Sequence, residues 1–276
     1  MAAEYPKREV AACRAVMVEA FTILGEYRDR IALVGGWVPP LLAPDSADQH
    51  TGSLDIDLAV DTNRIGDDAY RTIRDALARH GYEQGDQPFR FFRTVPFEGG
   101  EPVKVEVDLL AGEYGGTGDS HRTQLVQDLR ARKARGCDLV FDHTVAVRLS
   151  GTMPDGARNE VKVRIAGPVP FLVMKGMALW DRKNAKDAYD IYWLVRHYPG
   201  GIEALVTEFT PAINNALVVE GLAKIRSKFG AIDAIGPVWA AQVKSSGADE
   251  PAQIARDAFE RVNALLDWLH IEPFEA

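Results

Sequence analysis

Two aspartates at alternate positions, Asp55 and Asp57, have the types and spacing in this 276-residue sequence that most directly suggest chemistry. They lie in SLDIDLAV, residues 53–60, where apolar and polar residues alternate as in a strand with one buried face. Residues two apart on a strand point the same way, so both carboxylates leave one face. Adjacent carboxylates repel unless a cation lies between them, and Mg²⁺ binds through a couple of carboxylates plus substrate phosphates. The pattern predicts a divalent metal site; the alternative is an edge strand with two solvated acids.

Small residues come before the acids in two places. Gly35-Gly36 follows an apolar run over residues 31–34, which is typical of a strand, and Gly52-Ser53 directly precedes the acids. Glycine lets the backbone approach a ligand closely, and backbone amides suit anions. We therefore expect these residues to bind the anionic part of a substrate.

A later segment, residues 103–110, offers a third acid. Its valines and Leu109 share one face of the expected strand, whereas Lys104, Glu106 and Asp108 share the other. A neighbouring strand with an acid is what a third metal ligand requires. Spacing alone does not choose between Glu106 and Asp108.

A second charged block lies in the C-terminal half. Lys186 and Asp190 are four residues apart and Asp187 and Asp190 are three apart, so on a helix all three project to one side. Ion pairing within the helix is the simple explanation. Lys175 lies one expected helix earlier among apolar residues, where its amine either reaches past the apolar surface to water or faces an anion across a cleft. We favour the cleft.

These two blocks carry a resemblance to a known family. The order Gly35-Gly36, Ser53-x-Asp55-x-Asp57 and a later strand acid resembles the nucleotidyltransferase superfamily of DNA polymerase β, and more narrowly the AbiEii/AbiGii toxin family, which includes the MenT toxins. The C-terminal block is similar to that family's Lys…Arg-x-Lys-x-Lys-Asp-x-Tyr-Asp signature, here carried by Lys175, Arg182 and residues 186–190, with Ala185 where a basic residue often stands. The resemblance covers roughly residues 31–195, and it favours Asp108 as the third acid because of its Val-Asp-Leu context.

The resemblance implies a metal-dependent nucleotidyltransferase that moves a nucleoside monophosphate from an NTP to a hydroxyl. It implies two Mg²⁺ ions, with Mn²⁺ as a substitute, an RNA acceptor at the tRNA 3′ end, and an antitoxin protein as partner. The metal ligands would be Asp55, Asp57 and Asp108. The catalytic set would be these three with Lys175, Asp187 and Asp190. The nucleotide-binding set would be Gly35, Gly36, Gly52, Ser53, Lys175, Arg182 and Lys186, with Lys175 neutralising triphosphate charge.

Two other classes of function remain open on the sequence. A small-molecule nucleotidyltransferase of the antibiotic-modifying kind would share the fold and the acids and would need no RNA-binding surface. A catalytically silent binding module fits poorly, because Asp55, Asp57 and Asp108 are all present.

Composition bounds these functions further. The formal net charge is −8, from 32 basic and 40 acidic residues, which argues against general sequence-blind nucleic-acid binding but allows a local basic patch. The densest basic run, Arg130, Arg132, Lys133 and Arg135, reads as a solvated helix face or a phosphate contact. Cys13 and Cys137 lie far apart, which argues against a zinc site or disulfide framework. With no apolar run long enough to span a membrane, we expect a cytoplasmic protein with no membrane partner.

The expected fold is α/β (α+β): a nucleotidyltransferase-type mixed sheet with flanking helices, then a C-terminal helical domain. We place the catalytic domain at residues 1–167 and, from 168–276, a helical domain that completes the active-site cleft, with Gly167-Pro168 as the boundary. Apolar periodicity predicts helices over 7–27, 37–42, 67–80, 171–180, 184–198, 213–229 and 252–269. Strands are expected over 31–34, 53–60, 89–95, 103–110, 145–149 and 161–165. The glycine-rich stretch 113–121 lacks the Lys-Ser/Thr ending of a phosphate loop and is expected to be a surface loop.

Overall fold

The computed structural model describes residues 5–61, 67–97, 100–112, 123–126, 129–182, 184–244 and 250–275. The chain forms two compact units. The first, the sheet unit, contains Tyr5–Val38 and Gly52–Ala166. The second, the helical unit, contains Pro39–Thr51 together with the chain from Gly167 onward.

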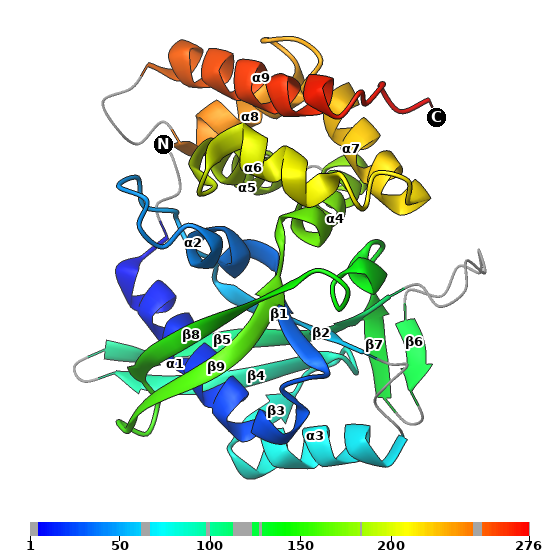
Figure 1. The fold of residues 1–276 in the computed structure, drawn as a ribbon. Coiled ribbons are helices and arrows are strands. Elements are labelled where there is room, and N and C mark those ends of the chain that lie inside the picture. The colour runs from blue at the N-terminus through cyan, green and yellow to red at the C-terminus, as the bar shows by residue number, and fades with distance from the viewer. Residues whose placement is uncertain are drawn as a thin grey trace. The chain divides into compact units, whose positions relative to one another are not determined.

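The sheet unit is built on one mixed sheet (Figure 1). Its main path runs β3-β4-β5-β2-β1-β9-β8, and β7 extends it by pairing with β5 and β6. The central pairs β2–β5 and β1–β9 are parallel, whereas β1–β2, β4–β5 and β8–β9 are antiparallel. The strands are β1 (Ile31–Val34), β2 (Asp55–Val60), β3 (Tyr82–Gln84), β4 (Arg90–Phe97), β5 (Gly100–Ala111), β6 (Thr123–Val126), β7 (Leu129–Lys133), β8 (Thr144–Thr152) and β9 (Arg158–Ala166).

Alternation along the central strands separates a core face from an acidic face. Ile56 and Leu58 of β2 and Val105 and Val107 of β5 are fully buried on the core face. The long helix α1 (Lys7–Ile23) packs against β5, β8 and β9, and α3 (Asp67–Arg79) packs against β3 (Figure 1). Burying one side of each strand fixes the register, because a slip by one residue would put every acid into the core.

The helical unit is organised around α5 (Ala185–His197), which contacts α4, α6, α8 and α9 (Figure 1). Tyr189, Tyr192 and Trp193 of α5 are almost completely buried. The helix begins at Asn184, whose side chain accepts a hydrogen bond from the Lys186 amide, as an N-cap residue does. The other helices are α4 (Pro168–Asp181), α6 (Gly201–Phe209), α7 (Ala216–Lys228), α8 (Ile235–Lys244) and α9 (Pro251–Trp268).

The structure confirms the expected fold class and most of the predicted elements. Pro39 and Pro40 fall in the first turn of α2 (Val38–Leu42), where a missing amide proton costs nothing, after the 3₁₀ helix η2 (Gly35–Trp37). Two further 3₁₀ helices are η1 (Gly25–Tyr27) and η4 (Cys137–Leu139). The short strand β3 and the helices α6 and α8 are additions to the prediction. The glycine-rich stretch 113–121 lies outside the described residues.

One prediction about the basic run is wrong. The densest basic run is expected to lie on a helix face, yet Leu129–Lys133 is the strand β7. Arg132 and Lys133 pair in parallel with Leu110 and Ala111 of β5, and β6 pairs antiparallel with β7. Backbone pairing with the last residues of β5, beyond the end of β4, outweighs the helix propensity of a short run rich in Leu, Arg and Ala.

Candidate active site

Four acidic side chains share one face of strands β2 and β5. In the parallel register, Asp57 lies opposite Asp108 and Asp55 lies opposite Glu106. Partners in register point to the same side of a sheet. The three predicted metal ligands therefore lie on one face, and Glu106 joins them. Asp108 is the most buried of these acids, at 3% exposure.

An arginine on the neighbouring strand neutralises part of this acidic face. Arg90 of β4 lies opposite Asp108. Its guanidinium donates from Nε to Asp108 Oδ1 at 2.9 Å and from Nη2 to Oδ2 at 3.0 Å, and Nη2 also lies 2.7 Å from Glu106 Oε1. Burial, together with the charge of Asp108, raises the pKa of Glu106, and Arg90 opposes that shift. The guanidinium thus holds the two candidates for the third acid at once.

The small residues predicted to bind the anionic substrate flank the same acids. Gly35 has φ +75°, and a Cβ there would overlap the Asp57 carboxylate, so only glycine permits this approach. Gly36 is buried in η2 beside it. Ser53 is buried, and its hydroxyl donates a hydrogen bond to Asp55 Oδ1. Gly52, with φ +77°, makes the turn that brings Ser53 to the strand.

The chemistry of these donors fits a hard divalent cation. Carboxylate oxygens from Asp55, Asp57 and Asp108 are the ligands Mg²⁺ prefers, and it commonly takes one or two of them together with substrate phosphates. Among the described residues, no three His, Cys, Asp or Glu side chains already converge as a complete metal cage. Arg90 engages both oxygens of Asp108 and would compete with an ion for them.

The residues of the second predicted charged block also lie together, within the helical unit. Lys175 of α4 places its Nζ 2.8 Å from Asp187 Oδ1 and 2.7 Å from Asp190 Oδ2. Arg182 Nε lies 2.8 Å from Asp187 Oδ2, and Lys186 Nζ lies 2.7 Å from Asp190 Oδ1. All five predicted residues therefore form one cluster of alternating charge.

Ion pairing keeps the buried groups of this cluster charged. Burial by itself would lower the pKa of Lys175, but the carboxylates of Asp190 and Asp187 raise it well above its usual value. Burial would likewise raise the pKa of Asp190, yet Lys175 and Lys186 hold it far below its usual range. Lys175 contacts carboxylates and its side chain is only 10% exposed, so an open cleft does not describe its surroundings. Its predicted role toward a triphosphate stays a prediction.

His50, which the sequence analysis missed, completes the cluster. Its imidazole is fully buried, stacks on Tyr189 and meets Trp193 edge-on, with Nε2 3.0 Å from Asp190 Oδ1. A carboxylate only accepts, so Nε2 carries the proton. Burial lowers the pKa of His50 from 6.5 to about 4 despite the contact with Asp190. No periodic pattern marks a histidine in a loop, so only the tertiary contact reveals it.

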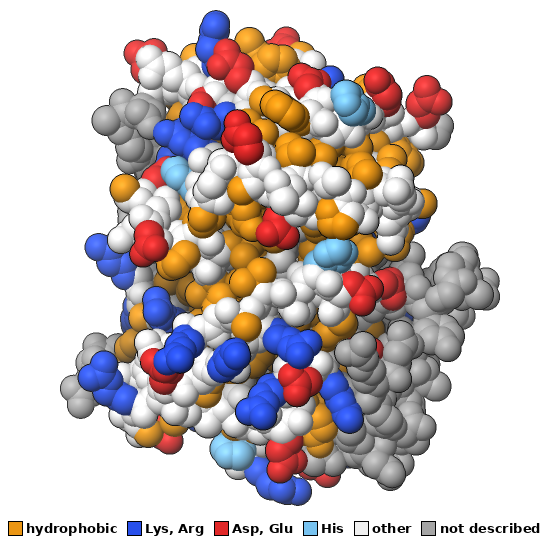
Figure 2. Space-filling view, viewed as in Figure 1, with side chains coloured by type: hydrophobic (Ala, Val, Ile, Leu, Met, Phe, Trp, Pro, Cys, Tyr) orange, Lys and Arg blue, Asp and Glu red, His pale blue; other side chains and the backbone are white. Residues whose placement is uncertain are grey.

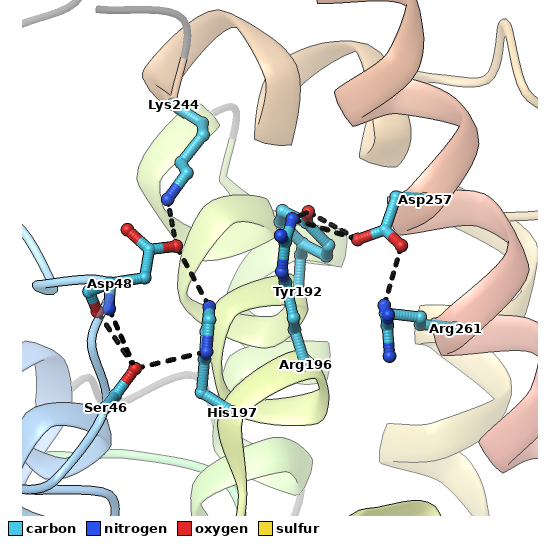
Figure 3. Close-up of polar contacts among 8 residues, drawn as sticks. All are labelled: Ser46, Asp48, Tyr192, Arg196, His197, Lys244, Asp257 and Arg261. Carbon is cyan, nitrogen blue, oxygen red and sulfur yellow. Dashed lines mark hydrogen bonds and ion pairs between the residues drawn. The ribbon is translucent and has the colours of Figure 1, made fainter. Parts of the chain in front are cut away.

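The loop that carries His50 is fastened to α5 and α8 by a second polar network. Asp48 lies between His197 of α5 and Lys244 of α8 (Figure 3), with His197 Nε2 3.0 Å from Asp48 Oδ2. Ser46 Oγ lies 3.1 Å from the other ring nitrogen of His197. These contacts of Ser46 and Asp48 fix the loop against α5 and α8 and hold His50 beside Asp190.

A parallel network ties α5 to α9. Tyr192 donates its hydroxyl proton to Asp257 at 2.6 Å, and Arg196 and Arg261 also contact that carboxylate (Figure 3). Together the two networks fix α5, and with it Asp187 and Asp190, from opposite directions.

A family model for the nucleotidyl transferase AbiEii toxin of type IV toxin–antitoxin systems matches residues 47–267. The chain belongs to the AbiEii family. The resemblance seen in the sequence is thereby confirmed, and the protein is a nucleotidyltransferase toxin. Membership also implies an NTP substrate and an antitoxin partner. No curated protein matches the chain.

The matched segment of this AbiEii protein contains both charged clusters, from Asp55 to Asp190, but begins after Gly35 and Gly36. Within the part of the chain that the structure describes, no helix is long and apolar enough to cross a membrane.

The pKa of His50 predicts a pH-dependent stability of the AbiEii fold. The pKa of His50 is lower in the folded than in the unfolded protein, so between pH 4 and pH 6.5 the unfolded chain binds more protons. The contribution of His50 to stability is therefore complete above pH 6.5 and is lost as the pH falls toward 4. A shift of this size corresponds to about 3 kcal/mol. We expect His50→Gln to be less stable at pH 7.5 but to lose much less stability on acidification, as measured by urea unfolding across this range.

The exposed His80 on the loop after α3 provides the control, because His80→Gln should keep the wild-type pH profile. The pKa of His197 is also lowered by burial, so a smaller slope in the same direction persists in His50→Gln. A variant profile parallel to that of wild type between pH 6.5 and 4 would contradict the assignment to His50.

Proposed function

We propose that this AbiEii toxin uses Mg²⁺ to transfer a nucleoside monophosphate from an NTP to the 3′-hydroxyl of an RNA, the 3′ end of tRNA. The observation that carries the metal part is the register of β2 and β5, which puts Asp55, Asp57 and Asp108 on one face. The RNA part is supported by the resemblance to the MenT-like toxins and by the basic hairpin described below. Extending the tRNA 3′ end would block aminoacylation, which is a toxic outcome.

The reaction joins the acceptor oxygen to the α-phosphorus of the NTP. The bond from that phosphorus to the bridging oxygen breaks, and pyrophosphate leaves with the electron pair. Asp55, Asp57 and Asp108 would hold Mg²⁺, which when bound stabilises phosphate charge and lowers the pKa of the attacking hydroxyl. Asp108 would accept the hydroxyl proton. Ser53 and the backbone at Gly35, Gly36 and Gly52 would orient the triphosphate.

The helical cluster takes two different roles in this proposal. Lys175 is buried between Asp187 and Asp190, so it positions those carboxylates as much as it offers charge. Arg182 is 49% exposed at its side chain while still contacting Asp187, which makes it the member best able to reach a triphosphate. Lys186, at 14% exposure, lies between these extremes. We propose that the cluster contributes to NTP use through this positive charge.

A basic surface suited to RNA lies on the β8–β9 hairpin rather than on the run found in the sequence. The exposed side of the hairpin carries Arg148 directly opposite Lys162, with Arg164 at a diagonal position and Arg158 four residues before Lys162 on the same face. Figure 2 shows lysine and arginine side chains gathered over these strands. Arg148 pairs with Glu160 at 3.2 Å and Arg164 with Asp29 at 3.0 Å, so Arg158 and Lys162 are the two side chains proposed to contact a polyanion.

The basic run named from the sequence and the basic residues of α7 are weaker candidates for such a role. The side chain of Arg130 lies outside the described residues, and Arg132 approaches Asp108 at 4.0 Å. In α7, Lys224 is buried and pairs with Glu220, and Arg226 pairs with Asp267. The β8–β9 hairpin is therefore the stronger candidate.

Carboxylate substitutions test the metal-dependent reaction. Asp57→Asn should lower the rate of NMP transfer by at least about 100-fold, because the acids together supply several kcal/mol of stabilisation through the metal. Asp108→Asn should be nearly as severe, and Glu106→Gln mild. The exposed Asp75→Asn is the control, with transfer from labelled NTP to total RNA as the measurement. A folded Asp57→Asn that transfers at the wild-type rate would end the metal proposal, and a reversed ranking would make Glu106 the third acid.

Arg90 should compete with the metal ion for Asp108. Arg90→Gln removes a positive charge from the acidic face, so the Mn²⁺ affinity of the nucleotide-free protein should rise by roughly fivefold, corresponding to about 1 kcal/mol. Electron paramagnetic resonance of free Mn²⁺ measures this without any turnover. Arg93→Gln is the matched control, because Arg93 lies on the same strand and binds Glu19 in the same two-pronged way. An affinity that is unchanged or weakened in Arg90→Gln would contradict the competition.

Salt dependence tests the RNA acceptor. For single strands, log affinity changes with log salt by about −0.7 per phosphate contact, so Arg158→Gln/Lys162→Gln should flatten the slope by roughly 1.4 while leaving the KM for NTP unchanged. Arg74→Gln/Arg79→Gln on α3 removes the same charge elsewhere on the sheet unit and should leave the slope unchanged. If no NTP labels the 3′ end of RNA at low salt while a small hydroxylated compound is modified, the small-molecule alternative replaces the RNA proposal.

A further inference from the structure

A cavity of about 350 Å³ opens on the acidic face of the sheet unit, beside the carboxylates but not used by the reaction described above. Its volume falls in the range of small-molecule sites. Six residues line it: Tyr5, Leu54, Asp55, Phe92, Lys104 and Glu106. The cavity shares Asp55 and Glu106 with the acidic face, so a molecule bound in it would reach the candidate metal ligands.

Strand register builds this cavity as a continuation of the acidic face. Phe92 of β4 lies opposite Glu106 of β5, and Glu106 lies opposite Asp55 of β2. Three neighbouring strands thus present an aromatic ring and two carboxylates in one row. Lys104 stands two residues before Glu106 on the same face, with its Nζ 4.0 Å from the centre of the Phe92 ring. The ammonium thus lies over an aromatic face at cation–π distance.

These side chains exclude two simple classes of ligand. An isolated anion would face the carboxylates of Asp55 and Glu106, which repel it. A purely aliphatic ligand would take the Lys104 ammonium and the Glu106 carboxylate out of water without giving either a new hydrogen bond, at a high cost. A suitable ligand therefore has a flat apolar face, hydrogen-bond donors at its edge and a negative charge nearby.

A nucleobase attached to its phosphate has all three properties. Its face stacks on an aromatic ring, as in proteins that bind single-stranded nucleic acids. Exocyclic amines and ring N–H groups donate hydrogen bonds to a carboxylate such as Glu106. The phosphate matches the ammonium of Lys104.

We propose that this cavity is a nucleobase subsite, in which the Lys104 ammonium moves from the Phe92 ring to the phosphate, the base stacks on the ring it leaves, and Glu106 accepts a hydrogen bond from the base. It rests on the proposed nucleotidyl transfer, because that reaction brings two nucleotides to the same carboxylates. The base belongs either to the terminal nucleotide of the acceptor or to the incoming NTP. Both have the same chemistry, and kinetics separates them.

Binding of nucleoside monophosphates tests the subsite directly, without turnover. Saturation-transfer NMR on the full chain should detect the base protons of at least one of AMP, CMP, GMP and UMP, and ribose 5-phosphate should bind much more weakly. Phe92→Leu keeps an apolar side chain but removes the ring, and should weaken the bound NMP by about tenfold. Lys104→Gln should lower the affinity for the NMP several-fold while leaving the affinity for the matching nucleoside unchanged.

Phe97→Leu is the matched control. Phe97 lies on the same strand and also carries a cation over its ring, with the Arg8 guanidinium carbon 4.8 Å from the ring centre, but it does not line the cavity. Its substitution should leave NMP affinity unchanged. Thermal unfolding of each variant separates lost binding from lost folding.

Steady-state kinetics then distinguishes the two sources of the base. A rise in KM for RNA alone in Phe92→Leu assigns the subsite to the acceptor, and a rise in KM for NTP alone assigns it to the incoming nucleotide. The proposal is overturned if no NMP binds, if Phe92→Leu stays within twofold of wild type, or if Phe97→Leu is equally impaired. Failure of RNA labelling with intact, Phe92-dependent NMP binding would instead refute the RNA acceptor and leave the subsite standing.

Discussion

Charge compensation of neighbouring carboxylates is the constraint on which both units of this AbiEii protein depend. Strands β2 and β5 place Asp57 beside Asp108 and Asp55 beside Glu106, and acids so close repel unless positive charge is supplied. In the sheet unit Arg90 supplies part of it. In the helical unit Asp187 and Asp190 are almost completely buried, and Lys175, Arg182 and Lys186 neutralise them. Each unit thus contains a group of acidic side chains that needs basic side chains beside it.

The two units differ in how deeply the compensating cation is buried. Lys175 is buried between its carboxylates, and removing it would leave buried charges unpaired, which costs several kcal/mol. The Arg90 side chain is 31% exposed, and it lies on the same face of the sheet as Asp108 and Glu106. Because the arginine is partly exposed, its ion pair is weakened by water more than that of Lys175. The helical cluster is therefore a fixed set of buried charges, whereas the acidic face is compensated by a partly exposed arginine.

The same acidic face also explains how the sheet unit can recognise a nucleotide beyond its phosphates. Register alone brings Phe92 and Lys104 to the row of acids, so stacking, hydrogen bonding and charge pairing become available within one cavity. On the β8–β9 hairpin the register similarly aligns Arg148 with Lys162. A protein with a net charge of −8 can in this way present a local basic surface.

The sequence by itself determined the strand carrying Asp55 and Asp57, the acid-bearing strand at 103–110, most helices and the family, because these rest on local periodicity and short motifs. It also identified every member of the helical cluster except His50. Only the tertiary structure decided that Asp108 faces Asp57, that Arg90 holds Asp108, and that residues 129–133 extend the sheet. Pairing between strands far apart in the chain depends on register, which no local pattern encodes. For the same reason Phe92 and His50 carried no signal in the sequence: their partners, Glu106 and Asp190, are brought to them by folding alone.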